Sequence, residues 1–348
     1  MMASPPDTHK LPLRPRRVRQ SDVARQAGVH PSTVSLALRP ETRHMISTDQ
    51  TQRIRQVAQD LGYSPDTIAV SMRTGRSRLI GMMLHDMSDP VYPTIAKGVE
   101  SAVRDHGYML MTGNTGYDQT AEADLLNAFS SRRVDGIILA TTRLDDPVVD
   151  RCVASGMPTV TVFRRPRKNT IPAVLNDCKV GMVQLVDTVQ DYGHQRLAFL
   201  SAPIDISSGK DRHDGVMQSL RPGTTCHVEF LAELTAEAGY LGARKLLAQG
   251  RPADVILCVN DLVAIGAYRA LKEAGLRCPE DVSVTGYNGM PFCDILDPPL
   301  TTVNIQLFEM GMLAGRALID LIEAHKVPAT ATCLRPELVL RKSLIKRV

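Results

Sequence analysis

The 348-residue sequence lacks the apolar segments that would place it in a membrane or direct it to secretion. No apolar run reaches the ~20 residues that a membrane-spanning helix needs. The N-terminus carries proline and arginine where a secretory leader would carry an apolar run. We therefore expect a soluble, cytoplasmic protein with no membrane partner.

Signatures of metal binding and of common catalytic motifs are also missing. No two cysteines have the close spacing of a zinc or redox motif, and their odd number favours reduced thiols. The sequence has no glycine-rich phosphate loop and no nucleophile elbow. We expect no metal, no cofactor and no catalytic residue. The scattered cysteines are Cys152, Cys178, Cys226, Cys258, Cys278, Cys293 and Cys333.

Positive charge is concentrated at one end of the chain. Hydrophobic residues make up 43% of the sequence, which predicts a packed globular protein of two or three domains. Residues 1–77 hold 12 Lys and Arg against 6 Asp and Glu, a net charge of +6. Residues 78–348 hold 29 against 31, a net charge of −2. This asymmetry predicts that the N-terminal end meets a polyanion.

The first periodic segment begins at Ser21. Residues 1–17 are rich in proline and arginine and predict a disordered basic arm. Ser21 is a suitable N-cap for a helix that carries Val23, Ala24 and Ala27 on one face. Gly28 provides the left-handed residue that ends such a helix. We expect a short helix between Ser21 and Gly28.

A second short helix is expected from Pro31 to Leu38. Proline suits the first turn of a helix, where no N–H donor is needed. Val34 and Leu38 would pack back onto the first helix, and the opposite face offers Ser32, Thr33, Ser35 and Leu36. Two short helices joined by a tight turn predict a helix-turn-helix, whose second helix fits the DNA major groove. An ordinary helical hairpin is the alternative, and the basic flanks weigh against it.

A third helix completes this N-terminal region, residues 18–64. Ser47 and Gln50 have the spacing of a capping box, and Ile54, Val57 and Ala58 continue at helical spacing. Residues 65–77 follow as a linker, within which residues 66–74 predict one short helix. This segment is either plain linker or a hinge helix that forms only on binding, because it is too short to be stable alone.

From Leu79 onward, apolar runs alternate with amphipathic stretches. This rhythm is typical of βαβ units, and it restarts after residue 162. It predicts two similar α/β subdomains of parallel sheets flanked by helices, with a ligand cleft between them. The expected strands are 79–85, 108–113, 135–140, 158–162, 196–201, 226–231, 255–260 and 337–341. The expected helices are 92–106, 118–132, 146–155, 180–191, 211–219, 235–248, 261–274 and 306–324.

Several motifs together resemble those of one family. They are DVA, AGV and STVS within 22–35, LGY at 61–63, RSRLIG at 76–81, VDGIIL at 134–139, GH at 193–194, ND at 260–261, EDVSVTGYN at 280–288, DPPLTTV at 297–303 and ELVLRKS at 337–343. The chain resembles the lactose-repressor/galactose-repressor family of bacterial transcription regulators from about Val18 to Leu344. The resemblance implies a helix-turn-helix headpiece, a hinge helix and a periplasmic-binding-protein-like core, residues 78–348, that binds an effector and dimerises.

The same resemblance implies a function. Such proteins are repressors that bind a palindromic operator in double-stranded DNA as homodimers. A small-molecule effector in the cleft sets their operator affinity. A transport solute-binding protein shares the core but needs a secretory leader, and an enzyme needs the missing catalytic motifs. Because no heptad-containing tail follows the last strand, we expect a dimer and not a tetramer.

Residues of the recognition helix and hinge are assigned by this resemblance. His30 and Leu36 depart from the serine cap and the arginine that many members have there. Met72 matches the hinge-helix leucine that wedges into the minor groove of the operator, with packing against the core as its alternative. The expected DNA-contacting residues are Ser21, His30, Pro31, Ser32, Thr33, Ser35, Leu36 and Met72.

Effector-binding positions follow in the same way. Phe163 stands where many members have an aspartate that binds sugar hydroxyls, and the chain has no tryptophan to stack on a sugar ring. Arg212 offers a fixed fork of donors. We therefore expect an effector with an anionic or strongly accepting group and an apolar or aromatic part. The expected residues are Asp89, Pro90, Tyr92, Phe163, Arg212, Asn260, Asp261 and Asn288; Asp261 suits a helix N-cap equally well.

Overall fold

The computed structural model describes residues 18–39, 42–64, 75–249, 253–324 and 330–347. The chain forms two compact units, and the division falls between Ser77 and Arg78. The expected basic arm, the expected hinge helix and Met72 lie outside the described residues.

Three helices and one 3-10 turn build the described part of the N-terminal unit. They are α1 (Gln20–Ala27), α2 (Pro31–Leu38), η1 (Arg43–Met45) and α3 (Thr48–Asp60). Small and branched apolar side chains from all three helices share one core, as the spacing predicts. The fully buried members are Val23, Ala24, Ala27, Val34, Ala37, Ile54 and Ala58.

The helix ends confirm the expected roles of Gly28 and Pro31 and correct the expected role of Ser21. Gly28 ends α1 with φ 64°, and Pro31 opens α2 behind the His30 ring, whose Nδ1 accepts from the Ser32 N–H at 3.2 Å. The prediction of Ser21 as the first cap was wrong. The helix begins earlier, at Gln20, because the Asp22 carboxylate reaches back to the Arg19 N–H at 2.9 Å.

The expected capping box of α3 is present in one direction. The Ser47 hydroxyl accepts from the Gln50 N–H at 3.3 Å. Among the hydrogen bonds of the described residues, none runs from the Ser47 N–H to the Gln50 side chain. Ser47 alone therefore satisfies one orphan donor of this helix end.

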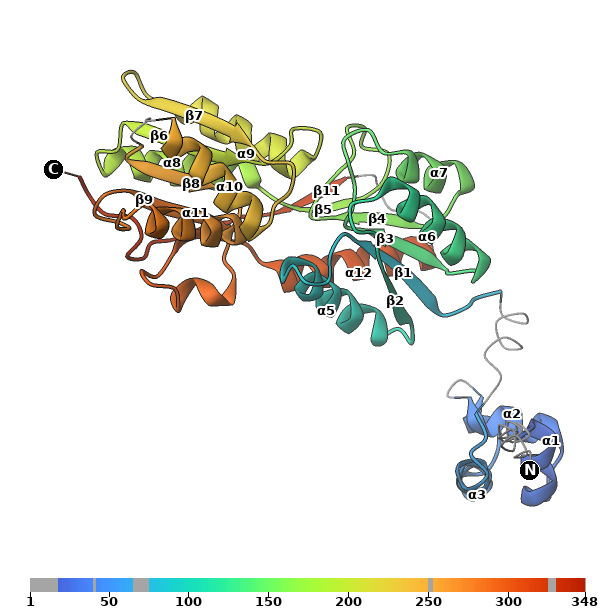
Figure 1. Ribbon diagram of the computed structural model, residues 1–348. Coiled ribbons are helices and arrows are strands. Elements are labelled where there is room, and N and C mark those ends of the chain that lie inside the picture. Colours follow the sequence, from blue (N-terminus) through green and yellow to red (C-terminus); the bar gives the residue numbers. More distant parts are fainter. Residues whose placement is uncertain (1–17, 40–41, 65–74, 250–252, 325–329, 348) are drawn as a thin grey trace, which may run out of the picture. The chain divides into compact units, whose positions relative to one another are not determined.

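Two six-stranded sheets form the C-terminal unit (Figure 1). The first sheet is parallel throughout, in the order β11-β5-β4-β3-β1-β2. Its strands are β1 (Leu79–Leu84), β2 (Met109–Asn114), β3 (Gly136–Leu139), β4 (Thr159–Val162), β5 (Ala173–Asn176) and β11 (Ala331–Leu334). The second sheet has the order β12-β10-β9-β8-β6-β7, with only β12 antiparallel to its neighbour. Its strands are β6 (Arg196–Ser201), β7 (Thr225–Phe230), β8 (Val255–Cys258), β9 (Ser283–Asn288), β10 (Thr301–Asn304) and β12 (Glu337–Val339).

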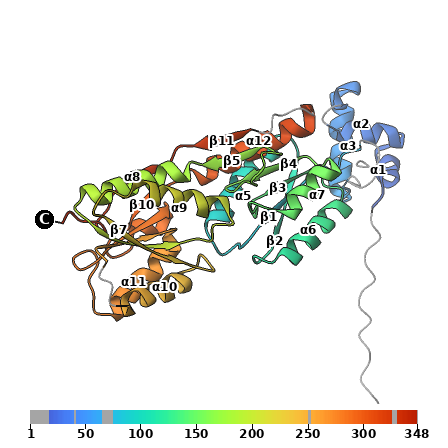
Figure 2. The ribbon, with the colours of Figure 1, turned by 90° about the horizontal axis from the view of Figure 1, so that it is seen from above.

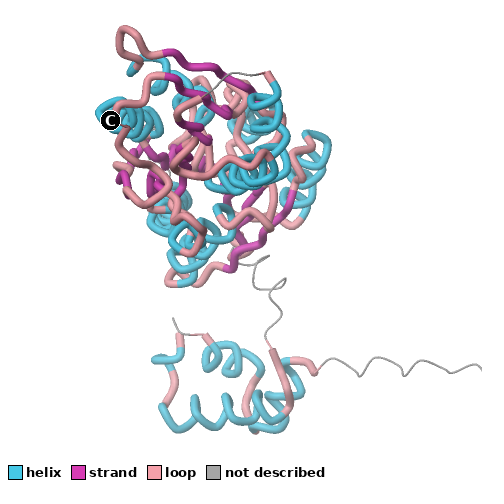
Figure 3. The backbone as a smooth tube through the Cα atoms, turned by 60° about the vertical axis from the view of Figure 1, so that its left-hand side comes forward, coloured by secondary structure: helices cyan, strands magenta, loops and turns pink. Residues whose placement is uncertain are grey.

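Helices cover both faces of each sheet, so each subdomain has three layers (Figures 1 to 3). Around the first sheet lie α5 (Val91–Arg104) and α12 (Leu307–Ala324) on one face, and α6 (Gln119–Ser131) and α7 (Pro147–Ser155) on the other. Around the second lie α8 (Cys178–Asp191) and α9 (Ser207–Ser219), opposite α10 (Ala236–Ala248) and α11 (Asp261–Glu273). A 3-10 turn, η2 (Pro291–Asp294), follows β9.

The side chains of β1 show how these layers form. Met82 and Leu84 face the α5 side, whereas Met83 packs with Phe129 of α6 on the opposite side. This alternation follows from the two-residue period of a strand. All of β1 except its first residue is buried, which explains why its sequence reads as a continuous apolar run.

The chain crosses between the two sheets three times. The crossings follow β5, β10 and β11, so α12 and β11 return to the first subdomain after most of the second has formed. Hydrogen bonds tie the crossings together: the Asp177 N–H donates to the Leu334 carbonyl at 3.0 Å, and the Gln306 amide donates to the Arg335 carbonyl at 3.1 Å. The alternation of apolar runs and amphipathic stretches predicts two contiguous series of elements. The structure instead shows two interleaved subdomains.

Helices α5 and α12 approach each other at glycines. A Cβ atom on Gly98 would lie 2.1 Å from the Phe308 carbonyl oxygen, and one on Gly311 would lie 2.1 Å from the Ile95 carbonyl oxygen. Real Cβ atoms do not come this close to backbone. The two helix backbones can therefore touch only because both positions lack a side chain.

We expect Gly98→Ala to lower the free energy of unfolding by about 1–3 kcal/mol, because it forces α5 and α12 apart. Helix propensity acts in the opposite direction, since alanine favours a helix over glycine by about 1 kcal/mol. Urea unfolding of the full chain measures the difference. The exposed Lys97→Ala on the same helix is the control, and a Gly98→Ala protein as stable as wild type would contradict this packing.

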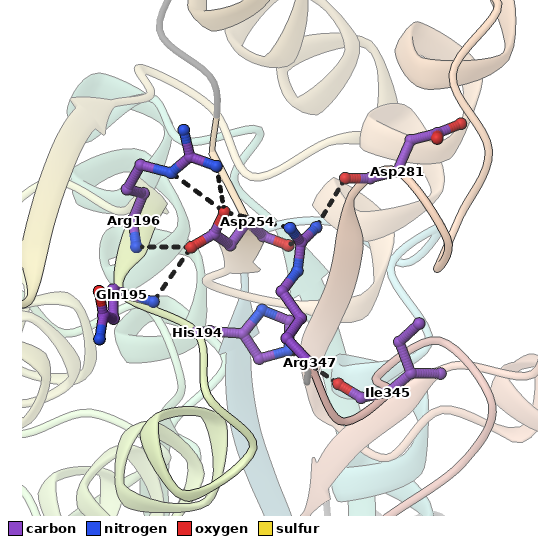
Figure 4. A network of polar contacts seen from close by, with 7 residues as sticks. All are labelled: His194, Gln195, Arg196, Asp254, Asp281, Ile345 and Arg347. Carbon is purple, nitrogen blue, oxygen red and sulfur yellow. Dashed lines mark hydrogen bonds and ion pairs between the residues drawn. The ribbon is translucent and has the colours of Figure 1, made fainter.

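A polar network fastens Ile345 and Arg347 to the second subdomain (Figure 4). Asp254, at the start of β8, accepts from the backbone N–H groups of Gln195 and Arg196 and from the Arg196 guanidinium at 2.7 Å. The Arg347 guanidinium donates to the same carboxylate at 3.3 Å and to the Asp281 carbonyl at 2.7 Å. His194 donates from Nε2 to the Ile345 carbonyl at 2.9 Å. His194 is therefore a structural residue, in agreement with its expected place just beyond a helix end.

Candidate effector site and DNA-binding surface

Residues from both subdomains meet at the carboxyl ends of their parallel strands. His85 follows β1 and Phe163 follows β4 in the first subdomain. Asn288 ends β9 in the second subdomain, and Arg212 lies on α9. Ligands of open α/β sheets bind at these strand ends. The carboxyl ends of the strands in the two sheets thus face one another.

Arg212 is the most constrained of these side chains. It is 2% exposed, and its guanidinium donates to the Val259 carbonyl at 2.6 Å and to the Asn288 side-chain oxygen at 3.0 Å. The guanidinium carbon also lies 3.9 Å from the centroid of the Tyr287 ring. The Nε atom is buried and has no hydrogen-bond partner among the described residues. Arg212 is therefore held rigidly with donors to spare.

Phe163 brings the first subdomain to Arg212. Its ring centroid lies 6.0 Å from the Arg212 guanidinium carbon and 6.5 Å from the Tyr92 ring. Phe163 has φ 68° and Asn288 has φ 114°, so both adopt left-handed backbone that side chains disfavour. Such conformations are costly and are typical of sites that hold ligands. Strain and burial coincide at this point of contact.

Asp89, Pro90 and Tyr92 lie at the start of α5. Asp89 accepts from the Val91 N–H at 3.0 Å, and Pro90 directly precedes the helix. Burial raises the pKa of the Asp89 carboxyl, although Arg164 and Arg212 oppose this shift. Burial likewise raises the pKa of Tyr92, which is 1% exposed. Tyr92 thus lies beside Phe163, and Asp89 is within electrostatic range of Arg164 and Arg212.

Asn260 and Asp261 have structural partners. Asn260 caps α11 by accepting from the Val263 N–H at 2.8 Å, and it donates to the Leu234 carbonyl at 3.0 Å. Asp261 is fully buried; its two oxygens accept from the Thr302 hydroxyl at 2.6 Å and the Met290 N–H at 2.8 Å. The cap of α11 is thus Asn260 and not Asp261. Both carboxylate oxygens of Asp261 are therefore occupied by hydrogen bonds within the protein.

Arg164 is a further residue of this site that was not expected from the sequence. Arg164 is 3% exposed and lies beside Phe163, with 6.0 Å between its guanidinium carbon and the ring centroid. It contacts His85 Nε2 at 2.8 Å and the Tyr92 hydroxyl at 3.4 Å. Burial, assisted by Arg164, lowers the pKa of His85 to about 2, so the imidazole is neutral and accepts from Arg164. The only sequence signal was the basic run after a predicted strand.

The neighbouring arginine joins the two subdomains directly. Arg165 pairs with both carboxylate oxygens of Asp211 on α9, at 3.0 and 2.9 Å, and its N–H donates to the Ser207 hydroxyl. Nearby, the Leu144 N–H donates to the Asp205 carbonyl at 2.9 Å. These hydrogen bonds connect the first subdomain to the second near Phe163.

In the headpiece, one face of α2 is open to solvent. Pro31 and Ser32 are exposed, whereas Thr33, Ser35 and Leu36 are half-buried. Ser35 accepts from the Arg39 guanidinium at 2.7 Å. Arg39 is thus a further candidate for DNA contact. Ser21 is exposed in the first turn of α1, and His30 is exposed just before α2.

Two family models match almost the whole chain. The model of bacterial regulatory proteins of the lacI family matches residues 21–66. The model of periplasmic binding proteins and the sugar-binding domain of the LacI family matches residues 77–336. The chain belongs to the LacI family.

Individual proteins agree with this assignment. The HTH-type transcriptional repressor PurR of Mannheimia succiniciproducens is 31% identical, over 93% of this chain and 98% of its own. The HTH-type transcriptional regulator RegA of Clostridium saccharobutylicum is 29% identical over 93% and 98%. The crystal structure of the lac repressor dimer bound to operator and the anti-inducer ONPF matches with TM-score 0.85 and 25% identity, over 95% of this chain and all of that one. This LacI-family protein is a DNA-binding transcriptional regulator and not an enzyme.

Other classes of site have no support in the described part of this LacI-family chain. Within it, no group of three or more His, Cys, Asp or Glu side chains is placed to hold a metal ion. All seven cysteines are free thiols. None of the helices described is both long and apolar enough to cross a membrane.

Proposed function

We propose that this regulator is a cytoplasmic repressor that binds a palindromic operator as a homodimer, with its operator affinity set by a small molecule at the contact of Phe163 and Arg212. The observation that carries the proposal is the buried Arg212, held by Asn288 of its own subdomain and facing Phe163 of the other. A ligand there favours one arrangement of the two subdomains over another. Only that preference can change affinity for DNA.

The matched proteins support this proposal. A lac repressor dimer occurs bound to operator and an anti-inducer. Related structures include the regulator CelR in complex with cellobiose. We assign DNA contact to the exposed face of α2, from His30 to Leu36, and to Ser21 and Met72. We assign effector contact to Asp89, Pro90, Tyr92, Phe163, Arg212, Asn260 and Asn288.

We propose an effector with an anionic or strongly accepting group and an apolar part. Arg212 supplies directed donors, and Phe163 supplies a flat apolar surface that cannot accept hydrogen bonds from sugar hydroxyls. Calorimetry of the full chain against neutral sugars and small acids tests this chemistry. Micromolar binding of an unmodified neutral sugar would contradict it.

The operator-reading role of α2 has its own test. We expect Thr33→Ala with Ser35→Ala to weaken operator binding by about 1–3 kcal/mol for each disturbed base contact, with little change on random DNA. The operator is first selected from a random DNA pool and checked for two-fold symmetry. Gel shifts then compare the two DNAs. Gln52→Ala, exposed on α3, is the control; equal loss on both DNAs would show that these side chains do not read bases.

A further inference from the structure

Two buried arginines from different subdomains surround the ring of Phe163. The guanidinium carbons of Arg164 and Arg212 each lie 6.0 Å from the ring centroid, so they are separated by no more than twice that distance. Arg164 is 3% exposed and Arg212 is 2% exposed. Both buried guanidinium groups therefore lie near the same aromatic ring.

Both arginines have unused donors. A guanidinium carries five N–H bonds. Arg164 directs one each to His85 and Tyr92, and Arg212 directs one each to Val259 and Asn288. The Nε atom of each is buried without a hydrogen-bond partner among the residues described. A buried charged donor left unpaired is costly, so a ligand with acceptors would relieve this cost at both positions.

Protein carboxylates do not neutralise these two groups by contact. The adjacent Arg165 pairs with Asp211 at 2.9 Å and Arg167 pairs with Asp145 at 2.8 Å. Within the described ranges, neither Arg164 nor Arg212 has a carboxylate oxygen within 4.0 Å. Arg164 and Arg212, the two arginines beside Phe163, therefore have hydrogen-bond partners that carry no negative charge.

Other titratable groups lie near these arginines: Asp89, Glu122, His85, Tyr92 and Tyr117. Asp89 is within electrostatic range of both arginines, and burial raises the pKa of its carboxyl. Burial and Asp146 raise the pKa of Glu122, beside His85, to about 7. His85 is neutral because its pKa is lowered to about 2. These groups compensate only part of the charge of the two arginines.

We infer that the effector is a compact dianion, with one acidic group bound by Arg212, the other by Arg164, and an apolar spacer against Phe163. The inference rests on the proposed function, because it specifies the ligand of the same site. Arg164 then determines specificity between acids with one and two anionic groups. A dianion also joins the two subdomains through its own charges, as Arg165 and Asp211 already do on one side.

Matched pairs of small acids test the inference by calorimetry on the full chain. The probes are isophthalate against benzoate and glutarate against butyrate, with benzamide as the neutral analogue. We expect at least one dianion to bind tenfold or more tightly than its monoanion. Arg164→Gln should reduce that dianion to the affinity of the monoanion and leave the monoanion unchanged. Arg164→Lys, which keeps the charge, should retain part of the preference.

Arg167→Gln is the matched control, because it removes an exposed arginine three residues away. Each variant is first checked for an unchanged thermal unfolding midpoint. Equal binding within both pairs, or no binding of either dianion at millimolar concentration, would overturn the inference. Equal weakening of both members of a pair by Arg164→Gln would also overturn it, since Arg164 would then only hold His85 and Tyr92 in place.

Operator binding separates this inference from the proposed function. If a neutral or monoanionic compound changes operator affinity, the proposed function stands and the dianion is wrong. If the protein selects no DNA site at all, the proposed function fails whatever the calorimetry shows.

Discussion

Replacing Asp254 with alanine should lower the free energy of unfolding by about 1–3 kcal/mol, the usual cost of leaving hydrogen-bond donors without their acceptor. The Asp254 carboxylate joins the edge between β6 and β8 to Arg347, and its side chain is only 7% exposed. Without it, the N–H groups of Gln195 and Arg196 lose their acceptor. Urea unfolding of the full chain gives the change.

The same substitution should remove part of the acid sensitivity. Burial raises the pKa of Asp254, but hydrogen bonds from the Arg196 side chain and from the two N–H groups outweigh burial and hold it below its ordinary value. Its stabilisation is therefore complete above the unfolded pKa of about 3.9 and is lost as pH falls through the folded value. The wild-type and Asp254→Ala stabilities should converge in that acidic range. Parallel curves would contradict this, and Asp214→Ala, an exposed pair with Lys210, should change little.

Replacing Arg212 with alanine should abolish the response of operator binding to effector. Coupling between two sites in a regulator is typically about 1–3 kcal/mol, which is a factor of roughly 5–150 in operator affinity. Arg212→Ala should bring this factor to one, because the effector then loses its directed donors in the second subdomain. Gel shifts with and without any compound that shifts wild-type binding measure the factor.

The unliganded protein distinguishes the sign of regulation. For an inducer, Arg212→Ala should bind operator as tightly as wild type and fail to release it. For a corepressor, it should stay weak on DNA. Arg244→Ala, exposed on α10, is the control. Because Arg212 also holds Asn288, Arg212→Lys checks that the loss comes from the missing guanidinium fork. A full response in Arg212→Ala would place the effector elsewhere.

The headpiece could be predicted because its signals are local. Gly28 and Pro31 act within one turn of their own helices, and the structure confirms both. The prediction of Ser21 as the N-cap failed because the carboxylate of Asp22 accepts from the Arg19 N–H, so the helix starts earlier. The helix expected from residue 211 begins at Ser207, where small residues gave no periodic signal.

Most strands of the core were predicted from their apolar runs, and the others gave no such signal. Four strands were not expected: β5, β9, β10 and β11. Three of them have only four residues, and β11 pairs with β5 from a distant part of the sequence. Arg164 was missed for the same reason, since its partner His85 is 79 positions away. No single-sequence pattern encodes such pairings.

The three crossings between the sheets also set the order in which the protein can be completed during synthesis. The first sheet lacks an edge strand until Ala331–Leu334 has emerged from the ribosome, and the second lacks one until Glu337–Val339 has. The core of the headpiece is formed by side chains within residues 23–63. A nascent chain therefore acquires its DNA-binding unit long before either half of its ligand-sensing unit is finished.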